Sequence, residues 1–229
     1  MDFILKGFVK AFYLFVNFDE ETFSAVFTTI KVSSLSILLS SLTGFPIGFF
    51  IGYFRFPLRN AMKFTFDVML SLPTVFIGLL VYAITTSRGP LGACGILFSV
   101  KAIAIGQYIL ALPLIISISS SIVEEAKDDL GLTLASLGAR GIRFFITYIV
   151  EIREGLFTAF LSAYGRILTE VGISMMVGGN IKWNTRTITT AIALETNRGE
   201  FANGIALGLI LLIVALSVNI LLYFLRRKK

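Results

Sequence analysis

Long apolar runs alternate with short polar stretches along most of the chain. The runs predict membrane-spanning helices, because about 20 apolar residues cross the hydrocarbon core of a bilayer as a helix. The predicted spans cover about 22–54, 64–86, 96–122, 156–179 and 203–225. Transmembrane strands need only about 10 alternating residues, so runs of this length favour helices. The pattern therefore predicts an all-α integral membrane protein with about five transmembrane helices, its membrane domain covering 22–225.

Residues 1–18 have a different pattern. Asp2, Lys6 and Lys10 recur every four residues, and apolar side chains such as Phe8 and Phe12 occupy the other faces. This spacing predicts an amphipathic helix that lies at the membrane interface. A sixth, short span is the less favoured alternative, because it would place two lysines in hydrocarbon.

Composition narrows the possible functions. The chain is 56% hydrophobic and only 15% charged, against about 25% charged in soluble domains, and its mean hydropathy is +0.87. It contains no histidine and a single cysteine, Cys94. Histidine catalysis, histidine metal sites and an intrachain disulfide are therefore excluded. The sequence also lacks a phosphate-binding Gly-Lys-Ser/Thr loop, so we expect no catalytic residue, no metal and no cofactor bound by this chain.

Positive charge is unevenly distributed between the loops. One set of alternate loops, together with the basic tail 226–229, carries eleven Lys and Arg: Arg55, Arg59, Lys63, Lys127, Arg140, Arg143, Arg153, Arg226, Arg227, Lys228 and Lys229. The opposite loops carry Arg88, Lys182, Arg186 and Arg198. The positive-inside rule then places the N-terminus outside and the C-terminus in the cytoplasm. It also explains the net charge of +6 without nucleic-acid binding.

The segment 124–155 interrupts the apolar pattern. It holds ten charged side chains: Glu124, Glu125, Lys127, Asp128, Asp129, Arg140, Arg143, Glu151, Arg153 and Glu154. Gly138 divides it into two helical halves, and the second, 141–150, carries more apolar residues than a solvated loop would expose. An apolar patch with a charged border indicates a docking surface. A loop folded onto its own membrane domain is an equally weighted alternative.

The spacing around Gly138 resembles the cytoplasmic loop of ABC-importer permeases, which reads Glu-Ala-Ala, three residues, Gly, nine residues, Ile-x-Leu-Pro. Gly138 matches the glycine, whereas 132–134 and 148–151 depart from the two flanking elements. The resemblance implies coupling helices that dock on an ATPase subunit. It assigns this role to Leu134, Ala135, Leu137, Gly138, Ala139, Arg140, Ile142, Arg143, Phe144 and Phe145.

A second stretch is more specific. Residues 164–180 read Tyr-Gly-Arg-Ile-Leu-Thr-Glu-Val-Gly and end at Gly179-Asn180, which is similar to the span after the coupling loop in oxyanion importers. Residues 185–202 resemble the Tup-type tungstate permeases in particular. The resemblance implies the fold of type I ABC importer permeases and a tetrahedral oxyanion as substrate.

Candidate residues for the anion path lie in the same region. Arg166 and Glu170 are four residues apart inside a predicted span, where an unpaired charge costs at least about 2.5–3.5 kcal/mol, so we expect them to pair on one helix face. They form either a structural brace or a gate. The hydroxyl and amide groups of the loop 180–202 suit a tetrahedral dianion and equally suit an ordinary wet loop. The candidates are Arg166, Glu170, Met175, Met176, Asn180, Thr187, Thr189 and Thr190.

The resemblance also implies an assembly. We expect two copies of the permease, two ABC ATPase subunits that bind ATP and Mg²⁺, and an extracytoplasmic oxyanion-binding protein. A molybdate or sulfate permease is the alternative of the same class. A self-contained carrier or channel, or a membrane scaffold that recruits a soluble protein, are the alternatives of other classes.

Overall fold

The computed structural model describes residues 2–227, and every regular element among them is a helix. The predicted all-α fold is confirmed. The helices are α1 (Asp2–Val16), α2 (Glu20–Tyr53), α3 (Arg59–Met69), α4 (Thr74–Thr85), η1 (Gly92–Cys94), α5 (Val100–Ser136), α6 (Gly141–Leu168), α7 (Gly172–Gly178), α8 (Ile188–Asn197) and α9 (Phe201–Arg227). Two residues of the predicted basic tail, Lys228 and Lys229, lie outside the described part.

Among the described residues, three helices are long and apolar enough to cross a membrane: α2, α5 and α9. The pair α3 and α4 makes a fourth candidate, bent at the break between them. The predicted span 64–86 is therefore not one helix. Pro73 explains the break, because it disfavours a helical conformation of Leu72 and has no N–H to donate. It is extended itself, at ψ 130°, and directly precedes α4.

The predicted span 156–179 is also not one helix. It is divided between α6, which ends at Leu168, and α7, which begins at Gly172. The segment 124–155, in turn, is less separate from the membrane helices than expected, since α5 continues to Ser136 and α6 begins at Gly141. The predicted division at Gly138 is present: its φ is +76°, a conformation that favours glycine.

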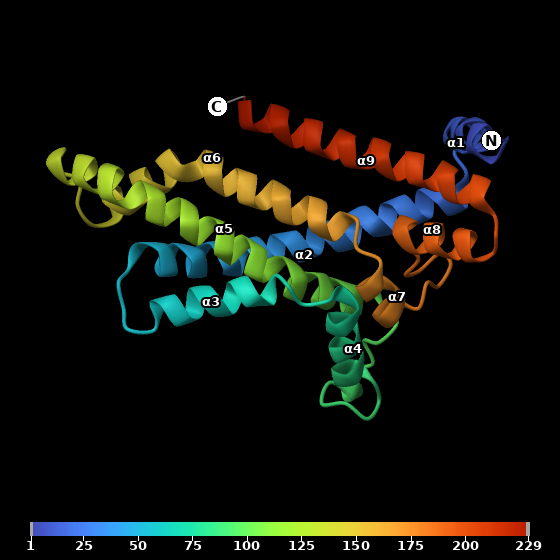
Figure 1. The fold of residues 1–229 in the computed structure, drawn as a ribbon, viewed down its shortest axis with the longest axis horizontal. Coiled ribbons are helices and arrows are strands. Elements are labelled where there is room, and N and C mark those ends of the chain that lie inside the picture. The colour runs from blue at the N-terminus through green and yellow to red at the C-terminus, as the bar shows by residue number, and fades with distance from the viewer. Residues whose placement is uncertain (1, 228–229) are drawn as a thin grey trace. The chain divides into compact units, whose positions relative to one another are not determined.

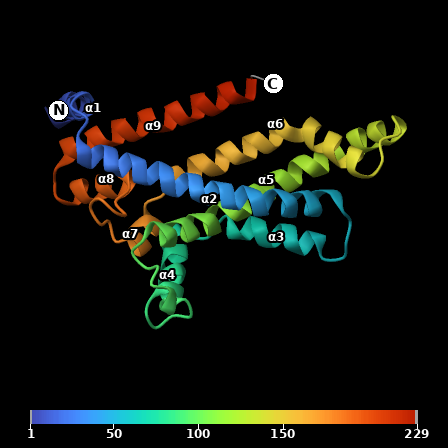
Figure 2. The same cartoon turned by 180° about the vertical axis from the view of Figure 1, so that it is seen from behind.

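The chain forms two compact units. The first comprises the described residues up to Ser36, Pro73–Gln107 and the described residues from Gly165 onward. In this unit α9 packs against α1 and α8, and α4 packs against α7 (Figures 1 and 2). Gly7 allows α1 to approach α9 closely, because an added Cβ would lie 2.6 Å from the Ile205 side chain.

The second unit comprises Ile37–Leu72 and Tyr108–Tyr164. Here α2 packs closely on α5 through Gly44, Gly48 and Gly52, which recur every four residues in the sequence and therefore lie on one helix face. A Cβ at Gly48 would lie 2.0 Å from Ser119 Oγ, and one at Gly52 would lie 2.5 Å from the Ser120 carbonyl oxygen. The core of the unit is the cluster Phe49, Val123, Leu134, Tyr148 and Ile152.

Candidate functional site

The break between α6 and α7 is the centre of the candidate anion site. A helix that ends inside a membrane protein leaves carbonyl groups that need other donors. Thr169 Oγ1 lies 3.3 Å from the carbonyl oxygens of Gly165 and Arg166, and Gln107 Nε2 donates to the Ile167 carbonyl at 3.3 Å. The donors come from the break itself and from α5, so the interruption is a stabilised part of the fold.

Glu170 lies in this break and is 3% exposed. Its carboxylate oxygen Oε1 accepts a hydrogen bond from the backbone N–H of Ile173 at 3.1 Å, and Oε2 lies 3.8 Å from Arg166 Nη1. The predicted pairing of Arg166 with Glu170 is confirmed, but the two do not share a helix, because Glu170 follows the end of α6. Since the Arg166 side chain is 49% exposed, its charge remains accessible from one side.

A chain of threonine hydroxyls continues from Glu170 into α8. Thr189 Oγ1 donates to the Glu170 carbonyl oxygen at 2.9 Å and lies 2.9 Å from Thr187 Oγ1. Thr187 and Thr190 form the capping box of α8, each side chain bonding to the backbone N–H of the other. These three threonines are buried, so their hydroxyls hold α8 against the break.

Asn180 and Glu21 extend the same network to the loop between α7 and α8. Asn180 Oδ1 accepts hydrogen bonds from Thr190 Oγ1 at 2.9 Å and from Arg186 Nε at 3.2 Å. Arg186 also pairs with Glu21 at the start of α2, and Lys182 Nζ lies 2.6 Å from the second Glu21 oxygen. The cations of this loop are thus balanced by a carboxylate that precedes them by about 160 positions in the sequence.

These contacts form one polar network, which we call the break network: Glu21, Arg166, Glu170, Asn180, Lys182, Arg186, Thr187, Thr189 and Thr190. It contains three cations and two carboxylates, and its buried hydroxyls already have partners. Buried polar networks that are fully paired are rigid. A passing oxyanion would therefore have to exchange with existing partners, most easily at the half-exposed Arg166.

The residues assigned to ATPase coupling lie in the second unit, around the turn between α5 and α6. Leu134 is 5% exposed and belongs to the core cluster, while Ala139 and Phe144 pack against that cluster. Leu134 is therefore not a surface residue, contrary to the assignment from the motif spacing. It points inward because α5 continues past the charged residues as an ordinary packed helix.

Other apolar residues of this turn are exposed. Leu137 is 77% exposed and Ile142 is 70% exposed. With Phe145 and Ile146, which are also exposed, they form what we call the tip surface, bordered by the exposed residues Arg140 and Arg143. An exposed apolar group bordered by cations fits the docking surface that the sequence led us to expect.

Ion pairs connect α5 with α3 in the same unit. Glu124 follows the apolar part of α5, and its carboxylate pairs with Arg59 Nη2 at 2.8 Å and with Lys63. The hydrogen bonds from Lys63 and Arg59 hold the pKa of the Glu124 carboxyl below its ordinary value. Deeper in the unit, Tyr148 Oη donates to the Val123 carbonyl oxygen at 2.8 Å, and burial raises the pKa of this phenol to about 12.

Comparison with known proteins gives the family. Residues 44–229 match the family described as "Binding-protein-dependent transport system inner membrane component". The chain belongs to this family.

The permease is similar to two proteins named as tungstate uptake system permease TupB. It is 48% identical over 227 residues to the protein of Campylobacter jejuni, covering 99% of this chain and 95% of that one. It is 33% identical over 228 residues to the protein of Peptoclostridium acidaminophilum, covering all of both chains. A probable anion ABC transporter permease of Haloferax volcanii is 37% identical over 198 residues, which are 84% of this chain and 85% of that one.

Family membership confirms the resemblance and the multi-pass membrane location. Of the candidate path residues, the structure brings six into the break network: Arg166, Glu170, Asn180, Thr187, Thr189 and Thr190. Met175 and Met176 lie on α7 instead, and the Met176 side chain packs toward Gly78 of α4.

Sequence reasoning missed Glu21 and Gln107 of the permease. Gln107 is 2% exposed and carries the only polar amide side chain of the predicted span 96–122, which is a signal that could have been used. Glu21 gave no comparable signal in the sequence. It is a charged residue at the start of the first predicted span, a position where charged surface residues are common.

Proposed function

We propose that this chain is the membrane-spanning permease subunit of an ATP-driven ABC importer that moves tungstate into the cytoplasm. Its similarity over nearly the whole chain to two tungstate uptake permeases carries the proposal. The molybdenum permease of Azotobacter vinelandii also matches 92% of this chain, but at only 25% identity. The higher identity of the two tungstate permeases, 48% and 33%, favours tungstate as the cargo.

The break network suits a tetrahedral dianion that passes without being held tightly. Arg166 offers a half-exposed guanidinium, which binds oxyanions through paired N–H groups. Its neighbour Glu170 competes for the same guanidinium at 3.8 Å, and this competition limits the affinity for the anion. Release matters in a translocation path, because a site that binds too strongly blocks transport. High affinity then belongs to the binding protein.

The proposed assembly contains two permease copies, two ATPase subunits with ATP and Mg²⁺, and an extracytoplasmic oxyanion-binding protein. In this proposal the tip surface docks on the ATPase. Helix α6 contains both Ile142 of the tip surface and Arg166 of the break network. In this proposal, movement of the tip surface on the ATPase reaches Arg166 along this helix.

The proposed orientation follows from the basic residues. It puts the N-terminus outside, and it puts the tip surface and the C-terminus in the cytoplasm. Helix α1 then lies at the outer interface, where its exposed Phe, Leu and Val side chains face lipid.

Molybdate or sulfate remains the second candidate cargo. The permease is 25% identical to a molybdenum transport permease of Azotobacter vinelandii and 23% identical to a sulfate transport permease of Escherichia coli. Both values lie below those for the tungstate permeases. Family membership disfavours a self-contained carrier, because the family works with a binding protein.

Transport by the reconstituted system tests the proposal. Proteoliposomes that contain the permease and its ATPase should accumulate tungstate only when ATP is inside and the loaded binding protein is outside. A non-hydrolysable ATP analogue is the control. Excess molybdate and sulfate should compete less well than tungstate. Uptake driven by an ion gradient without ATP would show that the permease is a self-contained carrier. Preferential uptake of molybdate would show that molybdate, and not tungstate, is the cargo.

A further inference from the structure

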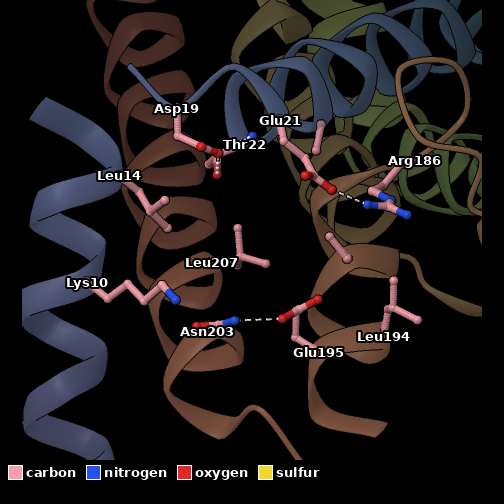
Figure 3. A pocket seen from close by; sticks show the side chains of 12 residues that line it. Lys10, Leu14, Asp19, Glu21, Thr22, Arg186, Leu194, Glu195, Asn203 and Leu207 are labelled. Carbon is pink, nitrogen blue, oxygen red and sulfur yellow. Dashed lines mark hydrogen bonds and ion pairs between the residues drawn. The ribbon is translucent and has the colours of Figure 1, made fainter. Parts of the chain in front are cut away.

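A small cavity in the first unit adjoins the break network, since Glu21 and Arg186 belong to its wall. Its volume is about 190 Å³, and it is bordered by α1, the start of α2, α8 and α9. The apolar part of its wall includes Leu14, Leu194 and Leu207 (Figure 3). The polar part of the wall includes Thr22 and Asn203 together with charged side chains of both signs.

Two charged residues of the wall, Arg186 and Glu21, pair with each other. The remaining cation is Lys10, whose side chain extends from α1 into the cavity (Figure 3). The remaining carboxylates are Asp19 and Glu195. Asp19 Oδ2 accepts hydrogen bonds from the backbone and the hydroxyl of Thr22, at 2.9 and 2.6 Å. Glu195 Oε2 accepts one from Asn203 Nδ2 at 2.8 Å, and Glu195 Oε1 lies 3.4 Å from Arg198 Nη1 at the exposed end of α8. Each carboxylate keeps lone pairs for a further donor.

A shallow apolar groove on α1 continues from this cavity. It is lined by Leu5, Lys6, Val9, Lys10 and Tyr13, so Lys10 borders both hollows. Leu5, Val9 and Tyr13 are exposed in the structure. In a multi-pass membrane protein, an exposed apolar helix face beside charged side chains is the arrangement found at the boundary between acyl chains and headgroups.

We propose that the cavity binds the headgroup of a membrane phospholipid that carries a primary ammonium, of the phosphatidylethanolamine type. The lipid phosphate pairs with Lys10, with Lys6 nearby on the same helix. The ammonium donates to the carboxylates of Glu195 and Asp19, and an acyl chain lies along the α1 groove. This inference goes beyond tungstate transport and does not depend on it.

Charge complementarity selects this headgroup among the common ones. A choline headgroup has no N–H to donate, so it cannot hydrogen-bond to the carboxylates. A glycerol headgroup can donate hydroxyl hydrogen bonds, but it has no cation and leaves the charge of Asp19 and Glu195 uncompensated. A primary ammonium supplies both the positive charge and the N–H donors, so it fits the carboxylate side of the cavity best.

Lipid retention by the purified full-length permease tests the inference. The protein is exchanged into nanodiscs of equal phosphatidylethanolamine, phosphatidylcholine and phosphatidylglycerol content, and native mass spectrometry after release counts the lipids that stay bound. Phosphatidylethanolamine should be enriched. Lys10→Ala and Glu195→Gln should each reduce that enrichment by about tenfold, the size expected for one charged hydrogen bond.

Matched controls separate this site from general lipid attraction. Lys101→Ala removes an exposed lysine at the start of α5, away from the cavity, and should leave the enrichment unchanged. Glu195→Gln keeps the side-chain shape and an acceptor for Asn203, so a folded variant is expected, and circular dichroism checks this. Equal retention of phosphatidylcholine would overturn the proposal, as would preference for phosphatidylglycerol or unchanged enrichment in both cavity variants.

Discussion

At the scale of single residues, the hydrogen bonds of Glu170 stabilise the local structure more than its ion pair with Arg166 does. Its carboxylate caps the backbone of α7 at Ile173, and its carbonyl oxygen receives Thr189 of α8. The interaction with Arg166 is long, at 3.8 Å, and half exposed to its surroundings. Half-exposed ion pairs contribute little free energy, so the buried hydrogen bond is the stronger contribution.

Substitutions of Glu170 should therefore differ. Glu170→Ala leaves the Ile173 N–H without its acceptor and should destabilise the permease by about 1–3 kcal/mol. Glu170→Gln keeps an acceptor for this N–H and carries no charge, so it should cost less. Thermal unfolding of the purified protein in detergent measures this order. A loss for Glu170→Gln as large as that for Glu170→Ala would contradict the assignment.

Transport separates a brace from a direct role in the path. If the pair only braces the break, the double variant Arg166→Ala with Glu170→Gln should transport better than Arg166→Ala alone, because no unpaired carboxylate is left and the acceptor for the Ile173 N–H is kept. Equal loss in both variants would instead show that the anion meets Arg166 directly.

At the scale of elements, the turn between α5 and α6 separates a buried face from an exposed one. Leu134 and Tyr148 anchor the two helices in the core, and this packing leaves Leu137 and Ile142 on the outside. Gly138 closes the turn at φ +76°, where a side chain would be strained. The position of the tip surface is therefore fixed by the core beneath it.

Charge on the tip surface should disrupt docking. Ile142→Glu combined with Leu137→Glu should weaken co-purification with the ATPase at least tenfold, about the loss from one strong interface residue. Ile142→Leu is the matched control and should retain binding. Both proteins should still insert into the membrane, since neither position belongs to a core cluster. If the charged variant co-purified with the ATPase as well as the unmodified permease does, the tip surface would not be part of the interface.

At the scale of the whole molecule, the orientation in the bilayer can be tested by labelling a native cysteine. Cys94 is the single cysteine of the chain, and it is exposed in the turn between α4 and α5. This turn is extracytoplasmic in the proposed orientation, because the basic loops face the cytoplasm.

Labelling of Cys94 tests this orientation. A membrane-impermeant maleimide added to intact spheroplasts should label the permease fully, and Cys94→Ser should remain unlabelled. An affinity tag after residue 229 should be digested by added protease only when the membrane is opened. Labelling that requires permeabilisation would reverse the orientation.

The sequence by itself determined the class of the protein, the approximate helices and two local devices, the turn at Gly138 and the glycine face of α2. These features depend on hydropathy and on the backbone conformations open to glycine, and both can be read from a short stretch of sequence. The spacing of Arg166 and Glu170 also predicted their contact. It did not predict that α6 ends between them. The carbonyl groups freed at this end accept hydrogen bonds from Thr169 and from Gln107, and Gln107 is distant in the sequence.

Only the tertiary structure decided which polar groups meet and which apolar groups are covered. Glu21 reaches Arg186, and Lys10 reaches the cavity beside Glu195, through the packing of helices far apart in the chain. Helices that are apolar on all sides give no periodic signal of their inward face. For the same reason Leu134 and Leu137, three residues apart in one polar segment, could be told apart only when the core around Tyr148 was in view.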